Sequence, residues 1–228
     1  MQLEKITISG KSEPKRRYDD ACGTAHALEL IGERWTLLVL RELMFGGRRF
    51  SELRAALPGI SANVLTQRLS ELEERGLARR TRLPPPASAQ VYEATPWGLE
   101  AEPVVQALGR WAARSPGHDP TLPISGVSIL LSFRTMISAK RAKGFDARVG
   151  FAFGYDRYLA RIKKGEIRIE RGDLTRADVV ISAAPSTLAA VVYGGQPIDL
   201  LGIAGDRAVA ERFVTLFPLP AKVGQDGY

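Results

Sequence analysis

The sequence is poor in the residues that build many catalytic and metal sites: its 228 residues include one cysteine and two histidines. The single cysteine, Cys22, excludes an intramolecular disulfide and leaves no cysteine pair for a metal. His26 and His118 have no nucleophile or ligand set beside them in the sequence. These absences predict a protein that is not an enzyme and that carries no catalytic residue, metal or cofactor.

Long apolar runs are also missing. No segment approaches the roughly 18 consecutive apolar residues of a membrane-spanning helix. The N-terminal residues mix charges throughout and lack the apolar stretch of a secretory signal. We therefore expect a cytoplasmic protein with no membrane partner. Its length suits two domains, because single domains usually have about 100–200 residues.

Positive charge is in excess, and it is distributed unevenly. The net charge is +7, which suits a polyanionic partner but does not identify one. Between residues 48 and 82 every basic residue is an arginine, the side chain that makes two-pronged contacts with phosphate and guanine. These arginines are Arg48, Arg49, Arg54, Arg68, Arg75, Arg79, Arg80 and Arg82.

The first half of the chain has the periodicity of several short helices followed by a hairpin. Residues 1–20 lack a periodic apolar pattern and are interpreted as an arm. Helices are predicted from Thr24 to Gly32, from about Trp35 to Leu43, over 49–57 and from Ser61 to Arg75. Two extended runs, 77–83 and 91–95, flank a proline-rich loop and predict a hairpin. A further helix starts at Pro96, and Pro103 should bend it.

The helix predicted from Ser61 to Arg75 is the most informative segment, since its two faces separate clearly at 100° per residue. Leu65, Leu69 and Leu72 form a narrow apolar stripe. The opposite side carries amides and hydroxyls, the groups that can pair with base edges in a major groove. Its polar residues are Asn63, Gln67, Ser70 and Glu74, with Thr66 and Arg68 on the flanks. A solvated helix side is the alternative interpretation.

A linker rich in proline and glycine separates this half from a second one with a different pattern. A helix is predicted over 127–143 and strands over 147–153, 157–164, 166–170 and 178–182, with two helices after them. The fold class is therefore α+β. We expect an arm over 1–20, a first domain over 21–115, a linker over 116–126 and a second domain over 127–222.

The first half resembles the HxlR group of winged helix-turn-helix regulators, relatives of the MarR type. The resemblance covers about 115 residues and rests on Cys22, on LELIGERWTLLVLRELMFGGRRFSELRAALPGISANVLTQRLSELEERGL (28–77) and on TPWG (95–98). It implies that Ser61, Asn63, Thr66, Gln67 and Arg68 contact base edges. It also implies that Arg48, Arg49, Arg79, Arg80 and Arg82 contact phosphate, and that terminal helices form a homodimer.

The second half is similar to sterol-carrier-protein-like modules, small α+β folds that can enclose an apolar pocket. The resemblance lies in the order of helices and strands and not in a set of reactive residues. It rests on residues 144–172, 178–195 and 205–217. It implies a ligand pocket lined by residues that are otherwise typical of a core. They are Phe133, Phe151, Phe153, Tyr158, Val180, Leu188, Val191 and Phe213.

Together these patterns predict a homodimeric repressor that binds a double-stranded DNA operator and responds to a hydrophobic small molecule in the second domain. An alternative is a lipid carrier or an enzyme that uses the second domain. A third possibility is a redox switch at Cys22, which is a small buried hydrophobe in the simpler interpretation. The nearby Asp19 and Asp20 would raise the pKa of its thiol.

Overall fold

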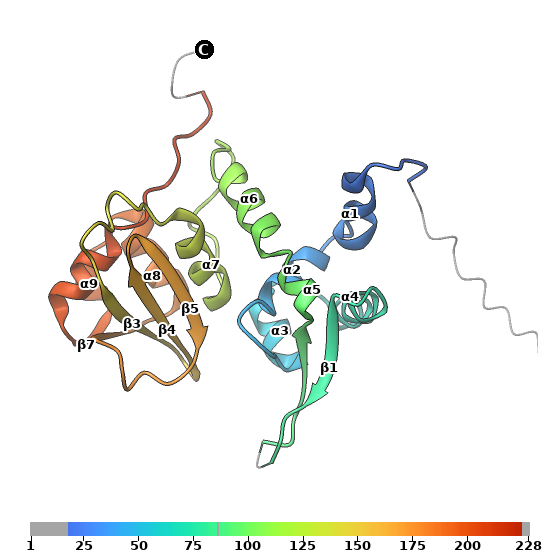
Figure 1. Cartoon of the computed structure of the whole chain (residues 1–228), viewed down its shortest axis with the longest axis horizontal. Coiled ribbons are helices and arrows are strands. Elements are labelled where there is room, and N and C mark those ends of the chain that lie inside the picture. Colours follow the sequence, from blue (N-terminus) through green and yellow to red (C-terminus); the bar gives the residue numbers. More distant parts are fainter. Residues whose placement is uncertain (1–17, 86, 225–228) are drawn as a thin grey trace, which may run out of the picture.

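The structure, a computed structural model, describes residues 18–85 and 87–224. Most of the predicted N-terminal arm, residues 1–17, lies outside this range. The N-terminal half holds the helices and strands α1 (Gly23–Ile31), α2 (Thr36–Glu42), α3 (Phe50–Ala56), α4 (Ala62–Glu74), β1 (Ala78–Arg82), β2 (Gln90–Ala94), α5 (Pro96–Leu99) and α6 (Glu102–Ala112). Figure 1 shows the β1–β2 hairpin projecting from this half.

A short helix fixes the base of the hairpin. Thr95 caps α5 with its hydroxyl, and the same hydroxyl donates a hydrogen bond to the carbonyl of Gly76. Gly98 lies so close to the turn before β1 that an added Cβ would be 2.0 Å from the Leu77 oxygen. The expected bend near Pro103 takes the form of a break, because α5 ends at Leu99 and α6 begins at Glu102.

The C-terminal half is one five-stranded sheet covered by helices. It contains α7 (Gly126–Met136), β3 (Ala147–Phe153), β4 (Asp156–Lys163), β5 (Glu166–Arg171), β6 (Val179–Ser182), α8 (Pro185–Gly194), a 3-10 turn (Ile198–Leu200), β7 (Gly202–Gly205) and α9 (Arg207–Val214). The strand order is β5-β4-β3-β6-β7, with β3 and β6 parallel and the other pairs antiparallel. Helices α7, α8 and α9 lie on one face (Figure 1).

One prediction for this half was wrong in extent, and one strand was not predicted. The helix expected over 127–143 ends at Met136, because Ile137 turns to an extended conformation and Ser138 donates its N–H to Leu216 of the C-terminal segment. Strand β7 was not predicted. It pairs with β6 at the sheet edge, and its two terminal glycines give no alternating apolar pattern.

The residues expected to line an apolar pocket are placed differently. Seven of the eight are buried, and several of their aromatic rings pack directly on one another. Phe133 lies 5.4 Å from Phe213 and 4.5 Å from Phe217, centroid to centroid, and Phe151 lies 5.6 Å from Phe213. The side chain of the eighth, Val180, lies on the opposite face of the sheet, beside Gly150. These side chains form a core because each ring fills the space next to another.

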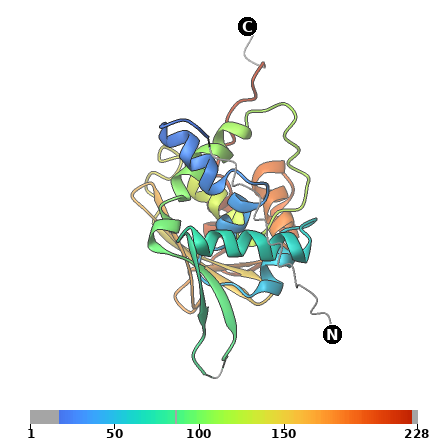
Figure 2. The ribbon, with the colours of Figure 1, turned by 90° about the vertical axis from the view of Figure 1, so that its right-hand side faces the viewer.

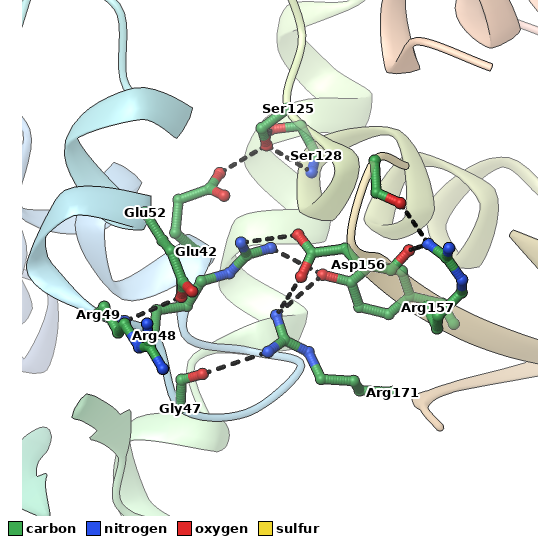
Figure 3. Close-up of polar contacts among 12 residues, drawn as sticks. Glu42, Gly47, Arg48, Arg49, Glu52, Ser125, Ser128, Asp156, Arg157 and Arg171 are labelled. Atoms are coloured by element: carbon green, nitrogen blue, oxygen red, sulfur yellow. Dashed lines mark hydrogen bonds and ion pairs between the residues drawn. The ribbon is translucent and has the colours of Figure 1, made fainter. Parts of the chain in front are cut away.

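The two halves meet at Arg48, which was expected to contact phosphate. Its side chain is only 6% exposed, and its guanidinium donates to Asp156 at 2.9 Å and to the Tyr158 hydroxyl at 2.7 Å (Figure 3). Arg171 completes the group, 3.2 Å from Asp156 and 3.2 Å from the same hydroxyl. We call these four residues the Arg48 junction. A guanidinium held in this way is not available to DNA, so the expectation for Arg48 is corrected.

Burial and charge set the protonation of the junction. Burial raises the pKa of Tyr158, although the positive charges of Arg48 and Arg171 partly offset that effect. Burial alone would lower the pKa of Arg171, but the neighbouring Tyr158 and Asp156 outweigh it, so the net shift is upward. The tyrosine therefore stays neutral and the arginine stays charged, and the hydroxyl accepts a hydrogen bond from each guanidinium.

Further contacts tie the halves together beside this junction. Phe45 packs edge-on against Tyr158 with centroids 5.8 Å apart, and the Arg134 guanidinium lies 4.5 Å above the Phe45 ring. Arg134 also pairs with Glu102 of α6 at 2.7 Å. Ser125, the cap of α7, donates its hydroxyl to Glu42 at 2.7 Å (Figure 3). The interface thus combines apolar packing with ion pairs and hydrogen bonds, while one atom each of Glu42, Arg48 and Arg134 stays buried without a partner among the described residues.

Removing one partner of the junction should separate the unfolding of the two halves. In Asp156→Ala the buried Arg48 loses its carboxylate, and we expect the free energy of unfolding to fall by about 2 kcal/mol. All three tryptophans, Trp35, Trp97 and Trp111, lie in the N-terminal half, so their fluorescence reports that half alone. Urea transitions followed by fluorescence and by far-UV circular dichroism should move apart.

Asp199→Ala is the matched control, because it removes an aspartate whose ion pair with Arg207 is exposed on the surface. Its effect should stay below about 0.5 kcal/mol. An unfolding curve of Asp156→Ala that superimposes on the wild-type curve would contradict a structural role for the junction.

Candidate nucleic-acid interface

Helix α4 is buried on one side and exposed on the other. Leu65, Leu69 and Leu72 are fully buried against the rest of the half, as their spacing predicts. Ser61 caps the helix by accepting a hydrogen bond from the Val64 N–H at 3.2 Å. In Figure 2 helix α4, in teal, runs horizontally across the molecule, and the hairpin extends downward below it. The exposed face of α4 is therefore held on a rigid support.

The exposed face carries short polar side chains. Ser61, Asn63, Thr66, Gln67 and Ser70 are all exposed. The Gln67 amide donates to Glu71 at 3.1 Å, and the Thr66 hydroxyl donates to the Ala62 carbonyl at 2.9 Å. These are local contacts on the helix surface that other partners can replace. The amide and hydroxyl face inferred from the sequence is therefore present and open to solvent.

Arg68 departs from the expected role in base contact. Its side chain is 10% exposed, and its guanidinium lies 2.8 Å from Glu71 and 3.6 Å from Glu33. The positive charge is therefore matched within the fold, because the helix flank that bears Arg68 packs toward the connection between α1 and α2. Arg68 is therefore not part of the exposed polar face of α4.

The hairpin supplies exposed arginines beside α4. Strands β1 and β2 pair in antiparallel register from Ala78 opposite Ala94 to Arg82 opposite Gln90. Arg79 lies 2.7 Å from Glu93, and Arg80 lies 3.1 Å from Glu73. Among the described residues, Arg82 donates only to the Ser88 carbonyl, at 3.3 Å. Exposed ion pairs are worth roughly 0–1 kcal/mol, so exchanging these carboxylates for phosphates costs little.

Arg49 stands at the start of α3, and its side chain is exposed. Its backbone N–H donates to Glu52 at 2.9 Å (Figure 3). Its guanidinium has no partner among the described residues. Of the two adjacent arginines at 48 and 49, one thus faces the C-terminal half and the other faces solvent.

Cys22 is exposed, so its interpretation as a buried hydrophobe was wrong. It lies at the N-terminal end of α1, where hydrogen bonds from Thr24 and the backbone of Ala25 lower the pKa of its thiol. The direction is opposite to the one inferred from Asp19 and Asp20, because hydrogen-bond donors at the helix end act on the sulfur directly. His26, which the sequence left without a role, lies 3.1 Å from Glu29.

Two groups escaped the sequence analysis. One is the Arg48 junction, whose partners are more than a hundred residues apart in the chain. The other is a set of arginines on the outer face of the C-terminal sheet, for which the sequence signal was arginine at polar positions of strands β3, β4 and β5. The described residues contain no cluster of three potential metal ligands and no helix long and apolar enough to cross a membrane.

Comparison with known proteins covers the N-terminal half. The family model "HxlR-like helix-turn-helix" matches residues 30–119. The regulator YvaP of Bacillus subtilis is 36% identical over 86 residues, which are 38% of this chain and 80% of YvaP. The regulator YodB of the same organism is 36% identical over 86 residues, 38% of this chain and 77% of YodB.

A cyanobacterial relative, sll1512 of Synechocystis, is 40% identical over 87 residues, 38% of this chain and 64% of that protein. The solved structure of the reduced form of YodB is 33% identical, covering 43% of this chain and 98% of that one, with a TM-score of 0.38.

The three sequence relatives are all named as HTH-type transcriptional regulators. This confirms the prediction of a DNA-binding transcriptional regulator instead of an enzyme. The C-terminal half lies beyond the residues that the family model matches. On the identity and coverage of these relatives, the chain belongs to the HxlR-like helix-turn-helix family.

Proposed function

We propose that the protein is a homodimeric repressor that recognises its operator through the exposed face of α4. Ser61, Asn63, Thr66 and Gln67 approach base edges in a major groove, and Arg49, Arg79, Arg80 and Arg82 contact the phosphates on either side. The observation that carries the proposal is the exposed amide and hydroxyl face of a helix whose other face is fully buried. The N-terminal part of such a helix enters the groove, which keeps Glu74 at its far end away from the duplex.

The amide side chains should determine which sequence is bound. With a duplex selected from a random pool by the wild-type protein, Asn63→Ala and Gln67→Ala should each weaken specific binding by about 1–3 kcal/mol. Affinity for an unrelated duplex should stay the same, because the phosphate contacts remain. Fluorescence anisotropy titrations on the two duplexes measure both quantities.

Arg82→Ala provides the contrasting control. It should weaken binding to both duplexes alike and reduce the slope of log affinity against log salt by roughly 0.9, since one phosphate contact is lost. If the alanine variants at Asn63 and Gln67 kept full specificity, α4 would not be the element that reads the sequence.

The homodimer is proposed to form through α1 and α6. These helices lie on the side of the N-terminal half away from the hairpin tip (Figures 1 and 2). Helix α6 carries Val104, Leu108 and Trp111 on one face, with Trp111 74% exposed, and α1 exposes Leu28. Apolar side chains at this spacing form a stripe that a second copy can cover.

A charge within that stripe should prevent dimerisation. We expect Leu108→Lys to be monomeric by size-exclusion chromatography with light scattering, and to bind the selected duplex much more weakly because only one half-site is engaged. Leu122→Lys places the same charge on another exposed leucine, in the loop after α6, and should remain dimeric. A dimeric Leu108→Lys protein would place the interface elsewhere.

A redox response at Cys22 is the second candidate function, favoured by the exposed thiol and its lowered pKa. A larger thiolate fraction reacts faster with peroxide, which converts the sulfur to a sulfenic acid. Since Cys22 lies at the start of α1, the added group would disturb the helix proposed to form the dimer.

Hydrogen peroxide should therefore lower duplex affinity several-fold in the wild type, and dithiothreitol should restore it. Cys22→Ser keeps a small hydroxyl-bearing side chain at the position and should not respond. Because the pKa of Cys22 is lowered, alkylation by iodoacetamide should reach half its maximal rate at a lower pH than for an ordinary cysteine. An equal peroxide response in Cys22→Ser would exclude this cysteine as the sensor.

For the C-terminal half we propose a regulatory role, exerted through the Arg48 junction. The resemblance to sterol-carrier-protein-like modules is supported by a sheet with helices on one face. The mutual packing of Phe133, Phe151 and Phe213 argues against a ready-made apolar pocket among those rings. A hydrophobic effector there, or a lipid-carrier function, would require this core to open.

A further inference from the structure

The outer face of the C-terminal sheet carries a row of arginines across three strands. Arg148 of β3 is paired in register with Arg161 of β4, which is paired in register with Arg168 of β5. Residues paired in register point to the same face, so three guanidinium groups extend side by side from neighbouring strands about 4.8 Å apart. Like charges directly opposite each other destabilise a sheet. Such a row suggests a requirement other than stability.

A fourth arginine is held beside the row by a fixed loop. Arg176 lies between β5 and β6, where Asp178 accepts the Arg148 N–H with its carboxylate at 2.6 Å and donates its own N–H to the Arg148 carbonyl at 2.8 Å. Gly150 allows this loop to approach, because an added Cβ would lie 3.2 Å from both Leu174 and Ala177. The loop is therefore packed on the sheet face.

Among the described residues, these four arginines lack the carboxylate partners that Arg79 and Arg80 of the hairpin have. In the described residues none of their guanidinium groups forms a hydrogen bond or an ion pair, whereas Arg48, Arg134 and Arg171 are all paired. The charge of Arg176 acts on Asp173 only as one of several influences that lower the pKa of that carboxyl. The row is thus a positive surface without ion pairs among the described residues.

The arginines surround a recess of about 340 Å³. Leu159 contributes an apolar side chain to its lining, and Glu170 is the acidic residue there. Ligand sites for small molecules have volumes of about 300–1,000 Å³ and combine apolar surface with a few polar groups. The size fits a small molecule.

We propose that Arg148, Arg161, Arg168 and Arg176 form a binding site for a small organic ligand that carries two or more phosphate groups. The guanidinium group offers paired N–H donors that match phosphate oxygens. Adjacent phosphates would lie between neighbouring guanidinium groups and relieve their repulsion, while the apolar part of the ligand contacts Leu159. The site is separate from α4 and the hairpin, so its existence does not depend on the proposed operator contacts.

Inorganic tripolyphosphate is the probe, titrated into the full chain at low salt by isothermal titration calorimetry. Arg161 is the centre of the row, and Arg161→Gln should weaken binding about tenfold or more. Arg157→Gln removes the same charge from the same strand, at a position outside the recess, and should change the affinity less than about twofold. The Arg161→Gln protein should unfold at the same temperature as the wild type or higher, because one like-charge contact is gone.

Three results would overturn the proposal. Equal weakening by both variants would show a response to net charge alone. Tripolyphosphate binding that Arg161→Gln leaves unchanged would place the anion elsewhere, for example at the hairpin. Loss of duplex affinity in Arg161→Gln, with no tripolyphosphate binding by the wild type, would show that the sheet face takes DNA instead. Failure of the α4 variants to alter sequence specificity would leave this site unaffected.

Discussion

One buried guanidinium determines how the two halves of the molecule meet. Arg48 lies between α2 and α3, and its charge is matched by Asp156 from the other half of the chain. A buried charge without a partner costs several kcal/mol. If Asp156 moved away from Arg48, the guanidinium would therefore have to be hydrated by water. Its backbone also pairs with Tyr92 of the hairpin through two hydrogen bonds of 2.8 Å. A single residue thus contacts both the hairpin and the C-terminal sheet.

Helix α4 was predicted well because one local rule determines its structure. Its apolar stripe faces a single core, so winding the sequence at 100° per residue separates Leu65 and Leu69 from Asn63 and Gln67 correctly. The rule fails at Arg68, on the boundary of the stripe, where Glu33 from another segment approaches. Exposure at a helix flank depends on neighbours that periodicity does not describe.

The errors at Arg48 and at strand β7 also arise from contacts with distant segments of the chain. In the sequence Arg48 and Arg49 are adjacent and equivalent, and only the fold brings Asp156 to one of them. Strand β7 exists because its backbone pairs with β6, and at Gly205 the close approach of Asp178 excludes a side chain. The alternation that predicted β3, β4 and β5 did mark the positions of Arg148, Arg161 and Arg168. It could not show that they align in register, which the pairing of strands decides.

Strand β5 offers a physical route from the sheet face to the DNA-binding half. Its Arg168 points to the outer face, whereas Arg171 at its end bonds to Asp156 and Tyr158 and lies 3.4 Å from the Gly47 carbonyl. The anion proposed to bind at Arg168 would act on the same short strand that holds the junction. A ligand changes DNA affinity only as far as it binds two arrangements of the protein unequally. Because Arg48 is bonded to the hairpin backbone as well, two such arrangements would differ in the position of the hairpin relative to α4.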